Sequence, residues 1–161
     1  MRIVLVALLL AGCGAAPDEG NVAGAALEEA AIARGVVRDP AATDIVGLYG
    51  RDTDQLCIVA SGNGHRIGAS VDYGDEGCSA SGTVTRGGES LRITFDNAPG
   101  CRFDARMDGD RIVFPGEVPA ACEKLCTERA SFAALEADLV SSAASEASGL
   151  RDRTDKLLCR S

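Results

Sequence analysis

The central part of the chain alternates between apolar and polar residues with a period of two. From Ile45 to Phe114 the alternating runs are separated by short segments rich in Gly, Asn and Asp. Such runs are typical of strands with one buried face, and Gly, Asn and Asp are the residues that tight turns prefer. The pattern predicts a mainly β fold, a single antiparallel meander of about seven strands that curls into a small barrel or a bent sheet. The first strand is expected over 45–50.

Short turn motifs set the expected register of these strands. Asn63-Gly64, Gly87-Gly88 and Asp108-Gly109 each suit a two-residue hairpin of type I′, which needs positive φ at both central residues. Longer turns are expected over 73–77 and 97–100. Because these motifs divide the alternating region into segments of strand length, they predict which strands are neighbours.

Hairpins centred on these motifs bring apolar residues together on one face of the sheet. The expected neighbours are Ala60 with Ile67, Val84 with Leu91, Ile93 with Phe103, and Phe103 with Phe114. On the other, solvated face Arg92 is expected across from Asp104, near the serines and threonines of 79–85. Because a slip of one residue would turn every apolar side chain toward water, the agreement of the turns with the alternation supports this assignment of faces.

The chain changes character on both sides of the alternating region. Residues 13–44 are rich in Ala, Gly and Glu, which predicts a tether with a short helix over 23–34. Pro115 and Pro119 end the alternation, and apolar residues at helical spacing then predict a helix over 130–142 that covers an open mouth or edge of the sheet. A loop or helix end is expected over 141–148.

The first thirteen residues have the pattern of a secretory leader. Met1-Arg2 precedes an apolar run from Ile3 to Leu10, far shorter than the roughly 20 residues that span a bilayer. The sequence Leu10-Ala11-Gly12-Cys13 follows and resembles the lipobox of bacterial lipoproteins. The resemblance implies cleavage before Cys13, a lipid on that cysteine, and a periplasm-facing location in the cell envelope. Gly14 resembles the pattern for delivery to the outer membrane. An ordinary secretory leader is the alternative.

The cysteines of the mature chain predict a disulfide framework. They are Cys57, Cys78, Cys101, Cys122, Cys126 and Cys159. An even number in a small exported protein indicates structural bridges. The first three lie in expected strands and the last three in the tail, and the C-x3-C spacing does not suit a bridge on a helix. We expect each tail cysteine to pair with a sheet cysteine, which leaves 3 × 2 pairings open. A zinc or redox site would normally contain C-x2-C, which the chain lacks.

Together these features predict three parts of the chain. They are a signal peptide over 1–12, a lipidated tether over 13–44, and a disulfide-stapled β domain with a C-terminal helix over 45–161. The formal net charge is −8, from 24 acidic and 16 basic residues, which argues against a nucleic-acid partner. Aromatic residues make up 4% of the chain, so the disulfides are expected to matter for stability.

Few residues of the chain suit catalysis. The one histidine, His65, lies at the first expected hairpin turn, so any Ser-His-Asp site must use it. Gly68-Ala-Ser70-Val-Asp72 departs from the G-x-S-x-G nucleophile elbow at its last position and lies in an expected strand. We therefore predict no catalytic residue, no metal and no cofactor. The remote alternative is a hydrolase, which would need a serine hydroxyl within about 3 Å of His65.

One short loop resembles a recognition motif. Lipoprotein inhibitors of lysozyme are small antiparallel β-barrels of the bacterial envelope with an S-G-x-x-Y loop that enters the lysozyme cleft. Ser61-Gly62-Asn63-Gly64-His65 looks like that loop with His in place of Tyr. The resemblance implies a partner-binding loop, and an acidic protein suits a cationic target. A tight hairpin accounts for the same residues without any function.

The chain as a whole resembles small cysteine-rich envelope lipoproteins of Gram-negative bacteria, a resemblance that implies no activity. We expect a non-catalytic binding or inhibitory module, tethered to the membrane by its lipid, with an envelope or exogenous protein as partner. The alternative is a structural or accessory lipoprotein without a ligand pocket. A concave apolar barrel mouth would favour the binding module, and a filled core under a flat polar exterior would favour the alternative.

Overall fold

The chain divides into two compact units at Asp39, and the computed structural model describes residues 19–34 and 44–160. The first unit contains helix α1 (Glu19–Ala33), which confirms a helix near the expected place but begins before residue 23. Its apolar side chains Val22 and Leu27 are exposed. Within 19–34 and 44–160, the structure contains no helix with the length and apolarity that a membrane span requires. Cys13 and the leader lie outside the described residues.

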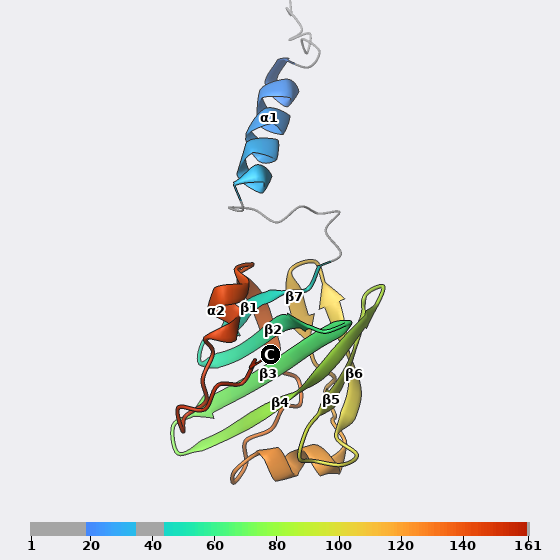
Figure 1. The fold of residues 1–161 in the computed structure, drawn as a ribbon, viewed down its shortest axis with the longest axis vertical. Helices are drawn as coiled ribbons and strands as arrows, with labels where there is room; N and C mark the ends of the chain where they lie inside the picture. Colours follow the sequence, from blue (N-terminus) through green and yellow to red (C-terminus); the bar gives the residue numbers. More distant parts are fainter. Residues whose placement is uncertain (1–18, 35–43, 161) are drawn as a thin grey trace, which may run out of the picture. The chain divides into compact units, whose positions relative to one another are not determined.

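The second unit is a closed antiparallel barrel in which every strand pairs with its neighbours along the chain (Figure 1). The strands are β1 (Gly47–Arg51), β2 (Asp54–Ser61), β3 (Gly64–Tyr73), β4 (Glu76–Gly87), β5 (Ser90–Phe95), β6 (Arg102–Asp108), β7 (Arg111–Val113) and β8 (Glu136–Ser141). The predicted fold class, a mainly β meander that curls into a small barrel with a C-terminal helix packed on it, is confirmed. The barrel has eight strands rather than seven.

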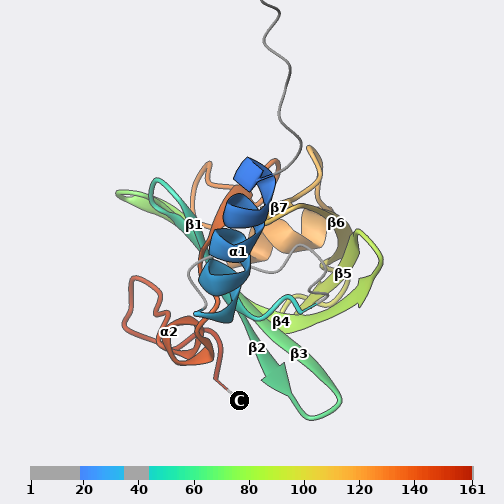
Figure 2. The ribbon, with the colours of Figure 1, turned by 90° about the horizontal axis from the view of Figure 1, so that it is seen from above.

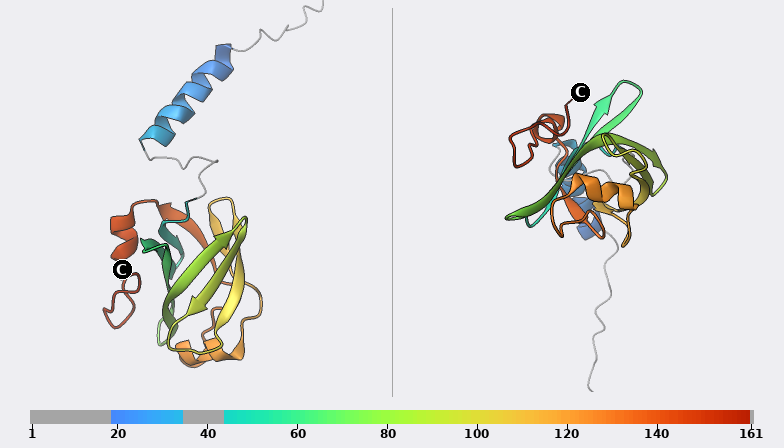
Figure 3. Two further views of the ribbon diagram at one scale, coloured as in Figure 1. Left: turned by 45° about the vertical axis from the view of Figure 1, so that its right-hand side comes forward. Right: turned by 90° about the horizontal axis from the view of Figure 1, so that it is seen from below.

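Two short helices accompany the barrel. The 3-10 helix η1 (Ala120–Leu125) lies in the long β7–β8 connection, at one end of the barrel (Figure 3). Helix α2 (Ala144–Ser148) follows β8 and packs outside the ring of strands, against β1 and β2 (Figure 2). The ends of the barrel are therefore unlike, because η1 covers one of them.

Side chains fill the interior of the barrel. Tyr49, Phe114 and Phe132 are its largest fully buried residues, with exposed fractions of 0–2%. The rings of Phe103 and Phe114 lie 4.9 Å apart between centroids, in an edge-to-face arrangement that aromatic pairs favour. The Tyr49 hydroxyl donates a hydrogen bond to the Ile45 carbonyl at 2.9 Å. The inside of this barrel is a packed core.

Three predicted hairpin centres are wrong by one residue. The turns fall on Gly62-Asn63, Gly88-Glu89 and Gly109-Asp110. Each begins with a glycine, at φ of 56°, 65° and 61°, and the second residue of each is not at positive φ. That is the arrangement of a type II′ turn, with glycine first, rather than the expected type I′ turn. Glycine therefore takes the first central position in all three.

A shift of a hairpin centre by one residue moves each cross-strand partner by two and so preserves the faces. The corrected neighbours are Ile58 with Ile67, Val84 with Ile93, and Met107 with Ile112. The pairs Ile93 with Phe103 and Arg92 with Asp104 are confirmed. Arg92 Nε donates to Asp104 Oδ1 at 2.9 Å on the outer face. Phe103 and Phe114 are not cross-strand partners, but their rings are in contact.

The predicted helix over 130–142 is wrong, because residues 136–141 form strand β8. Ala134 has a φ of 57°, which a right-handed helix does not contain. β8 pairs with β7 on one side and β1 on the other. Seven strands would leave two edges with unpaired backbone groups, and β8 satisfies both. The C-terminal helix is α2, which lies within 141–148, the segment expected to be a loop or helix end.

Two carboxylates of β8 form ion pairs with the strands on both sides of it. Arg51 of β1 donates hydrogen bonds to Glu136 and, at 3.4 Å, to Asp138. Arg111 of β7 donates from Nε to Asp138 Oδ1 at 2.7 Å. The hydrogen bond from Arg111 is the main reason that the pKa of Asp138 lies below its usual value. The seam that closes the barrel therefore carries charges of alternating sign on its outer face.

Candidate functional site

Three disulfides join the tail to the sheet, as expected. They are Cys57–Cys159, Cys78–Cys126 and Cys101–Cys122, with Cα–Cα distances of 6.1, 4.0 and 4.8 Å. The pairing that the sequence left open is thereby settled, and the two cysteines of the C-x3-C pair take different partners. Two bridges attach η1 and its C-terminal end to the barrel. The third attaches the end of the chain to the outer surface of β2.

The tail segment, residues 150–160, crosses the outer face of the sheet (Figure 1). Ser81 of β4 donates a hydrogen bond from Oγ to the Leu158 carbonyl at 2.8 Å. Leu150 and Leu158 pack with Val59 and Ala147 into a second small core outside the barrel. The face around 79–85, which was expected to be solvated, is therefore partly covered by the chain's own end.

Small residues of the sheet let the tail segment approach closely. A Cβ added at Gly68 of β3 would lie 2.5 Å from Leu158 Cβ and 2.7 Å from Cys57 Sγ. Such distances are far below van der Waals contact, so only glycine fits at this position. The sequence did contain this signal, because a glycine within an expected strand often marks a close backbone approach.

Asp152 organises the turn in the tail segment. Its Oδ1 accepts hydrogen bonds from the Thr154 and Lys156 amides, at 2.8 and 3.0 Å, and from the Thr154 hydroxyl. Its Oδ2 accepts one from Ser79 of β4 at 2.9 Å. Burial raises the pKa of Asp152, but these hydrogen bonds outweigh burial, and the net pKa lies below the usual value. The charged carboxylate therefore fixes the turn and ties it to the sheet.

Two hollows lie on the outer face beside the tail segment. The smaller, of about 320 Å³, lies between the tail and the end of η1 and is lined by Ser79, Leu125 and Asp152 among others. The larger, of about 450 Å³, lies between the tail, β3, β4 and the β5–β6 turn. We call the larger one the basic hollow, because Arg66, Arg151, Lys156 and Arg160 all line it.

The cations of the basic hollow are only partly neutralised. Arg66 Nη2 lies 2.8 Å from Asp96 Oδ2, and Arg151 lies 3.5 Å from the Asp155 carboxylate. Asp96 and Asp155 are the two acidic residues of the lining, so four cations and two carboxylates leave 4 − 2 = +2. Within 19–34 and 44–160, Lys156 and Arg160 have no carboxylate partner. A local surplus of positive charge therefore exists in a chain of net charge −8.

The loop Ser61–His65, expected as a partner-binding loop, is a tight hairpin. Ser61 pairs with Gly64, and Gly62-Asn63 forms the turn. His65 is half-buried on β3, with Nε2 4.0 Å from Asp44 Oδ1. Among the described residues no hydrogen bond joins a serine hydroxyl to His65, and the absence of catalysis stays a prediction. The hairpin interpretation is confirmed, and binding of a partner by this loop stays a prediction.

An acidic rim surrounds an exposed tyrosine at the end of the barrel that carries the β1–β2 and β3–β4 turns. Tyr73 is 60% exposed, and Thr53 bridges the two turns by donating to the Asp72 carbonyl at 2.6 Å. Burial raises the pKa of Asp54, and the charges of Asp52 and Asp72 add to that rise. We call Asp52, Asp54, Asp72, Tyr73, Asp75 and Glu76 the acidic rim.

Comparisons of the chain with protein-family models, with curated proteins and with solved structures find no match. In the part of the chain that the structure describes, no group of three or more His, Cys, Asp or Glu side chains is arranged to hold a metal ion. Interpretation of the site therefore depends on its own geometry and charge.

Sequence reasoning missed the basic hollow. Its four cations come from β3 and from the tail segment, which are far apart in sequence. A signal was present, since residues 151–160 contain Arg151, Arg153, Lys156 and Arg160 in a chain with only 16 basic residues. What the sequence could not show is that the Cys57–Cys159 bridge places this segment over Arg66.

Proposed function

We propose that the protein is a membrane-tethered envelope lipoprotein that acts as a non-catalytic binding module. The lipobox-like Leu10-Ala11-Gly12-Cys13 supports the tether. Three disulfides suit an exported, oxidising location, since such bridges seldom persist in the cytosol. The proposed location is the periplasm-facing surface of the envelope, at the outer rather than the inner membrane.

The observation that carries the proposal is the contrast between the inside and the outside of the barrel. Because Tyr49, Phe114 and Phe132 fill the interior, side chains take up the space inside the barrel. The exterior is not flat, since the basic hollow offers about 450 Å³ beside the tail segment, within the size range of small-ligand sites. We therefore place binding on the outer surface of β3 and β4.

Crosslinking in cells tests the proposal. A photo-reactive phenylalanine derivative replaces Leu157, which lines the basic hollow. The control replaces Val140, an apolar residue of β8 that is 65% exposed and lies outside the hollow. A binding module gives a defined crosslinked product from position 157 and not from position 140. Equal products from both positions, or none, would instead favour the structural or accessory alternative.

The tether is tested separately by mass spectrometry of the membrane fraction. We expect the mature chain to begin at Cys13 with a diacylglycerol on its sulfur, and an acyl chain on its amine. A Cys13→Ser variant should lose the lipid and leave the membrane fraction. An unmodified Cys13 thiol, or a wild-type protein found wholly in the soluble fraction, would contradict the lipoprotein part of the proposal.

The acidic rim favours a second candidate function, inhibition of a cationic protein such as lysozyme. Carboxylates around the exposed Tyr73 present the charge and the aromatic surface that such a target would recognise. If this candidate is correct, the purified protein slows lysis of bacterial cell walls by lysozyme, and Tyr73→Ala weakens that effect. Unchanged lysis in the presence of excess protein would eliminate it.

A further inference from the structure

We infer that the basic hollow binds a phosphate-type oxyanion. The inference rests on the proposed function, because it names the class of ligand for that surface. The residues that line the hollow carry a net charge of 4 − 2 = +2, and its volume is about 450 Å³. The chain as a whole has a net charge of −8, so the positive charge is local to the hollow.

Local charge outweighs overall charge at this surface. The Debye length at physiological ionic strength is about 8 Å, so carboxylates on distant parts of the barrel are largely screened. An anion in the hollow therefore responds mainly to the residues that line it. The acidic rim lies at the turns of β1–β2 and β3–β4, and its Asp72 pairs at 3.8 Å with Arg153 of the tail segment, which does not line the hollow. The hollow is completed by the β5–β6 turn, which contributes Asp96 and Asn97.

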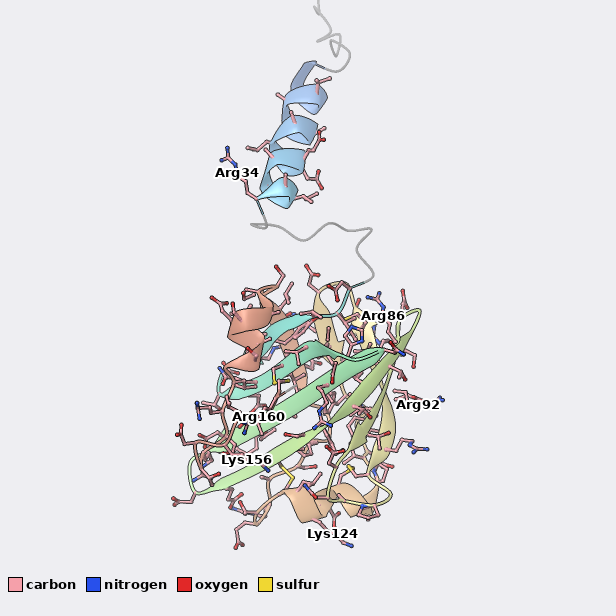
Figure 4. The ribbon with its side chains drawn as sticks, viewed as in Figure 1. Arg34, Arg86, Arg92, Lys124, Lys156 and Arg160 are labelled. Atoms are coloured by element: carbon pink, nitrogen blue, oxygen red, sulfur yellow. A yellow bond between two sulfur atoms is a disulfide. The ribbon has the colours of Figure 1, made fainter. Side chains whose placement is uncertain are left out.

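Two cations of the hollow are available to a ligand. Lys156 and Arg160 lie on the tail segment, on the face where it crosses the sheet (Figure 4). Within the described part of the chain neither side chain has an ion-pair or hydrogen-bond partner. Asn97 also lines the hollow, and its side-chain amide is a hydrogen-bond donor. These groups are donors, which is what an oxyanion requires.

Arg66 of β3 adds a further cation to the lining of the hollow. Its Nη2 donates to Asp96 at 2.8 Å, whereas its Nε is buried and has no hydrogen-bond partner among the described residues. The Nε has almost no accessible surface, so a ligand in the hollow cannot reach it. Arg66 therefore contributes its positive charge to the hollow, and Asp96 neutralises part of that charge.

The backbone that carries Lys156 and Arg160 is fixed before any ligand arrives. Arg160 follows directly after Cys159, which is bonded to Cys57 of β2. The Lys156 backbone amide donates to Asp152 at 3.0 Å. A site whose backbone is already fixed loses less conformational entropy on binding. Reduction of the Cys57–Cys159 bridge would remove this advantage.

The surplus of +2 suits a phosphate monoester better than a carboxylate. A phosphate monoester carries a charge of about −1.5 to −2 at pH 7 and presents three acceptor oxygens. A single carboxylate would leave one cation unneutralised. The phosphate group can belong to a soluble compound or to a phosphorylated lipid headgroup, and the chemistry of the hollow is the same for both.

The test titrates the exported protein, in a neutral detergent, with inorganic phosphate at constant ionic strength. Backbone amide chemical shifts of 150–160 report binding. We expect saturable shifts in the wild type and roughly fivefold weaker binding in Lys156→Gln and Arg160→Gln. Lys124→Gln on η1 is the matched control, because Lys124 is exposed and lies outside the hollow. It should bind phosphate as the wild type does.

Nanodiscs separate the two sources of phosphate. The protein is compared in discs of phosphatidylcholine alone and discs that also contain phosphatidic acid. Tail shifts that appear with phosphatidic acid identify a lipid headgroup, and shifts with inorganic phosphate alone identify a soluble compound. Equal phosphate responses in wild type, Lys156→Gln and Arg160→Gln, or no response in any condition, would overturn the inference. A retained crosslink from position 157 in that case would leave the proposed function standing.

Discussion

Gly68 of β3 lies against Leu158 of the tail segment so closely that a Cβ at position 68 would be 2.5 Å from the Leu158 Cβ. The contact joins the barrel to a segment ninety residues later in the sequence. Ser81 reinforces it with its hydrogen bond to the Leu158 carbonyl. Through this contact the outer face of the sheet fixes one wall of the basic hollow.

Gly68→Ala should therefore loosen the tail segment and lower the free energy of unfolding by roughly 1–3 kcal/mol, the usual cost of overpacking. Urea denaturation measures the loss, and amide hydrogen exchange of 150–160 shows where it occurs. Gly64→Ala is the control, because a Cβ at Gly64 meets no atom within 4 Å and its φ is not positive. Equal losses in the two variants would show that the close contact is not the cause.

Phe103→Ala should destabilise the protein strongly, by roughly 3–5 kcal/mol, because it leaves a cavity between Phe95 and Phe114. Arg92 lies on the opposite face of the same sheet, in a solvent-exposed pair with Asp104. Arg92→Ala should change stability little, since exposed ion pairs contribute little. Thermal unfolding compares the two variants. Similar shifts in the midpoint would contradict the assignment of faces.

Asp152→Asn should remove a pH-dependent part of the stability of the tail. Because folding lowers the pKa of Asp152, its contribution is present above the unfolded pKa of about 3.9 and is lost as the pH falls through the folded pKa. Wild type should exceed the variant in amide protection of 150–160 at neutral pH. The difference should shrink below about pH 4. A constant difference across that range would exclude ionisation of Asp152 as the cause.

Backbone strain at the hairpin turns gives another test. Gly88 has a φ of 65° and open space around its Cβ position, so Gly88→Ala should cost roughly 1–2 kcal/mol through backbone strain alone. Asp52 occupies the equivalent first position of the β1–β2 turn at a φ of 52°. Asp52→Gly relieves strain there and should be neutral or stabilising. Denaturation midpoints of the two variants test this prediction. A large loss of stability in Asp52→Gly would contradict the interpretation that positive φ strains the backbone at position 52.

The sequence by itself determined which residues face the core and which cysteines can meet. Alternation over 45–114 depends on the geometry of single strands, in which side chains point to opposite faces, so Ile93, Phe103 and Arg92 were assigned correctly. The prediction that each tail cysteine pairs with a sheet cysteine was also correct. It followed from the narrow range of Cα–Cα distances that a disulfide allows. The lipidation of Cys13 stays a prediction.

Tertiary structure decided the closure of the barrel and the position of the tail segment. Glu136–Ser141 is a strand because the free edges of β1 and β7 needed hydrogen-bond partners. The residues of this segment alone do not show that two distant strands have free edges. The hairpin centres depended on which position of each turn takes positive φ, a choice between turn types that the short motifs did not settle. The basic hollow arises where Arg66 meets Lys156 and Arg160. Those residues are brought together by a disulfide and a close backbone contact, so their proximity exists only in the folded chain.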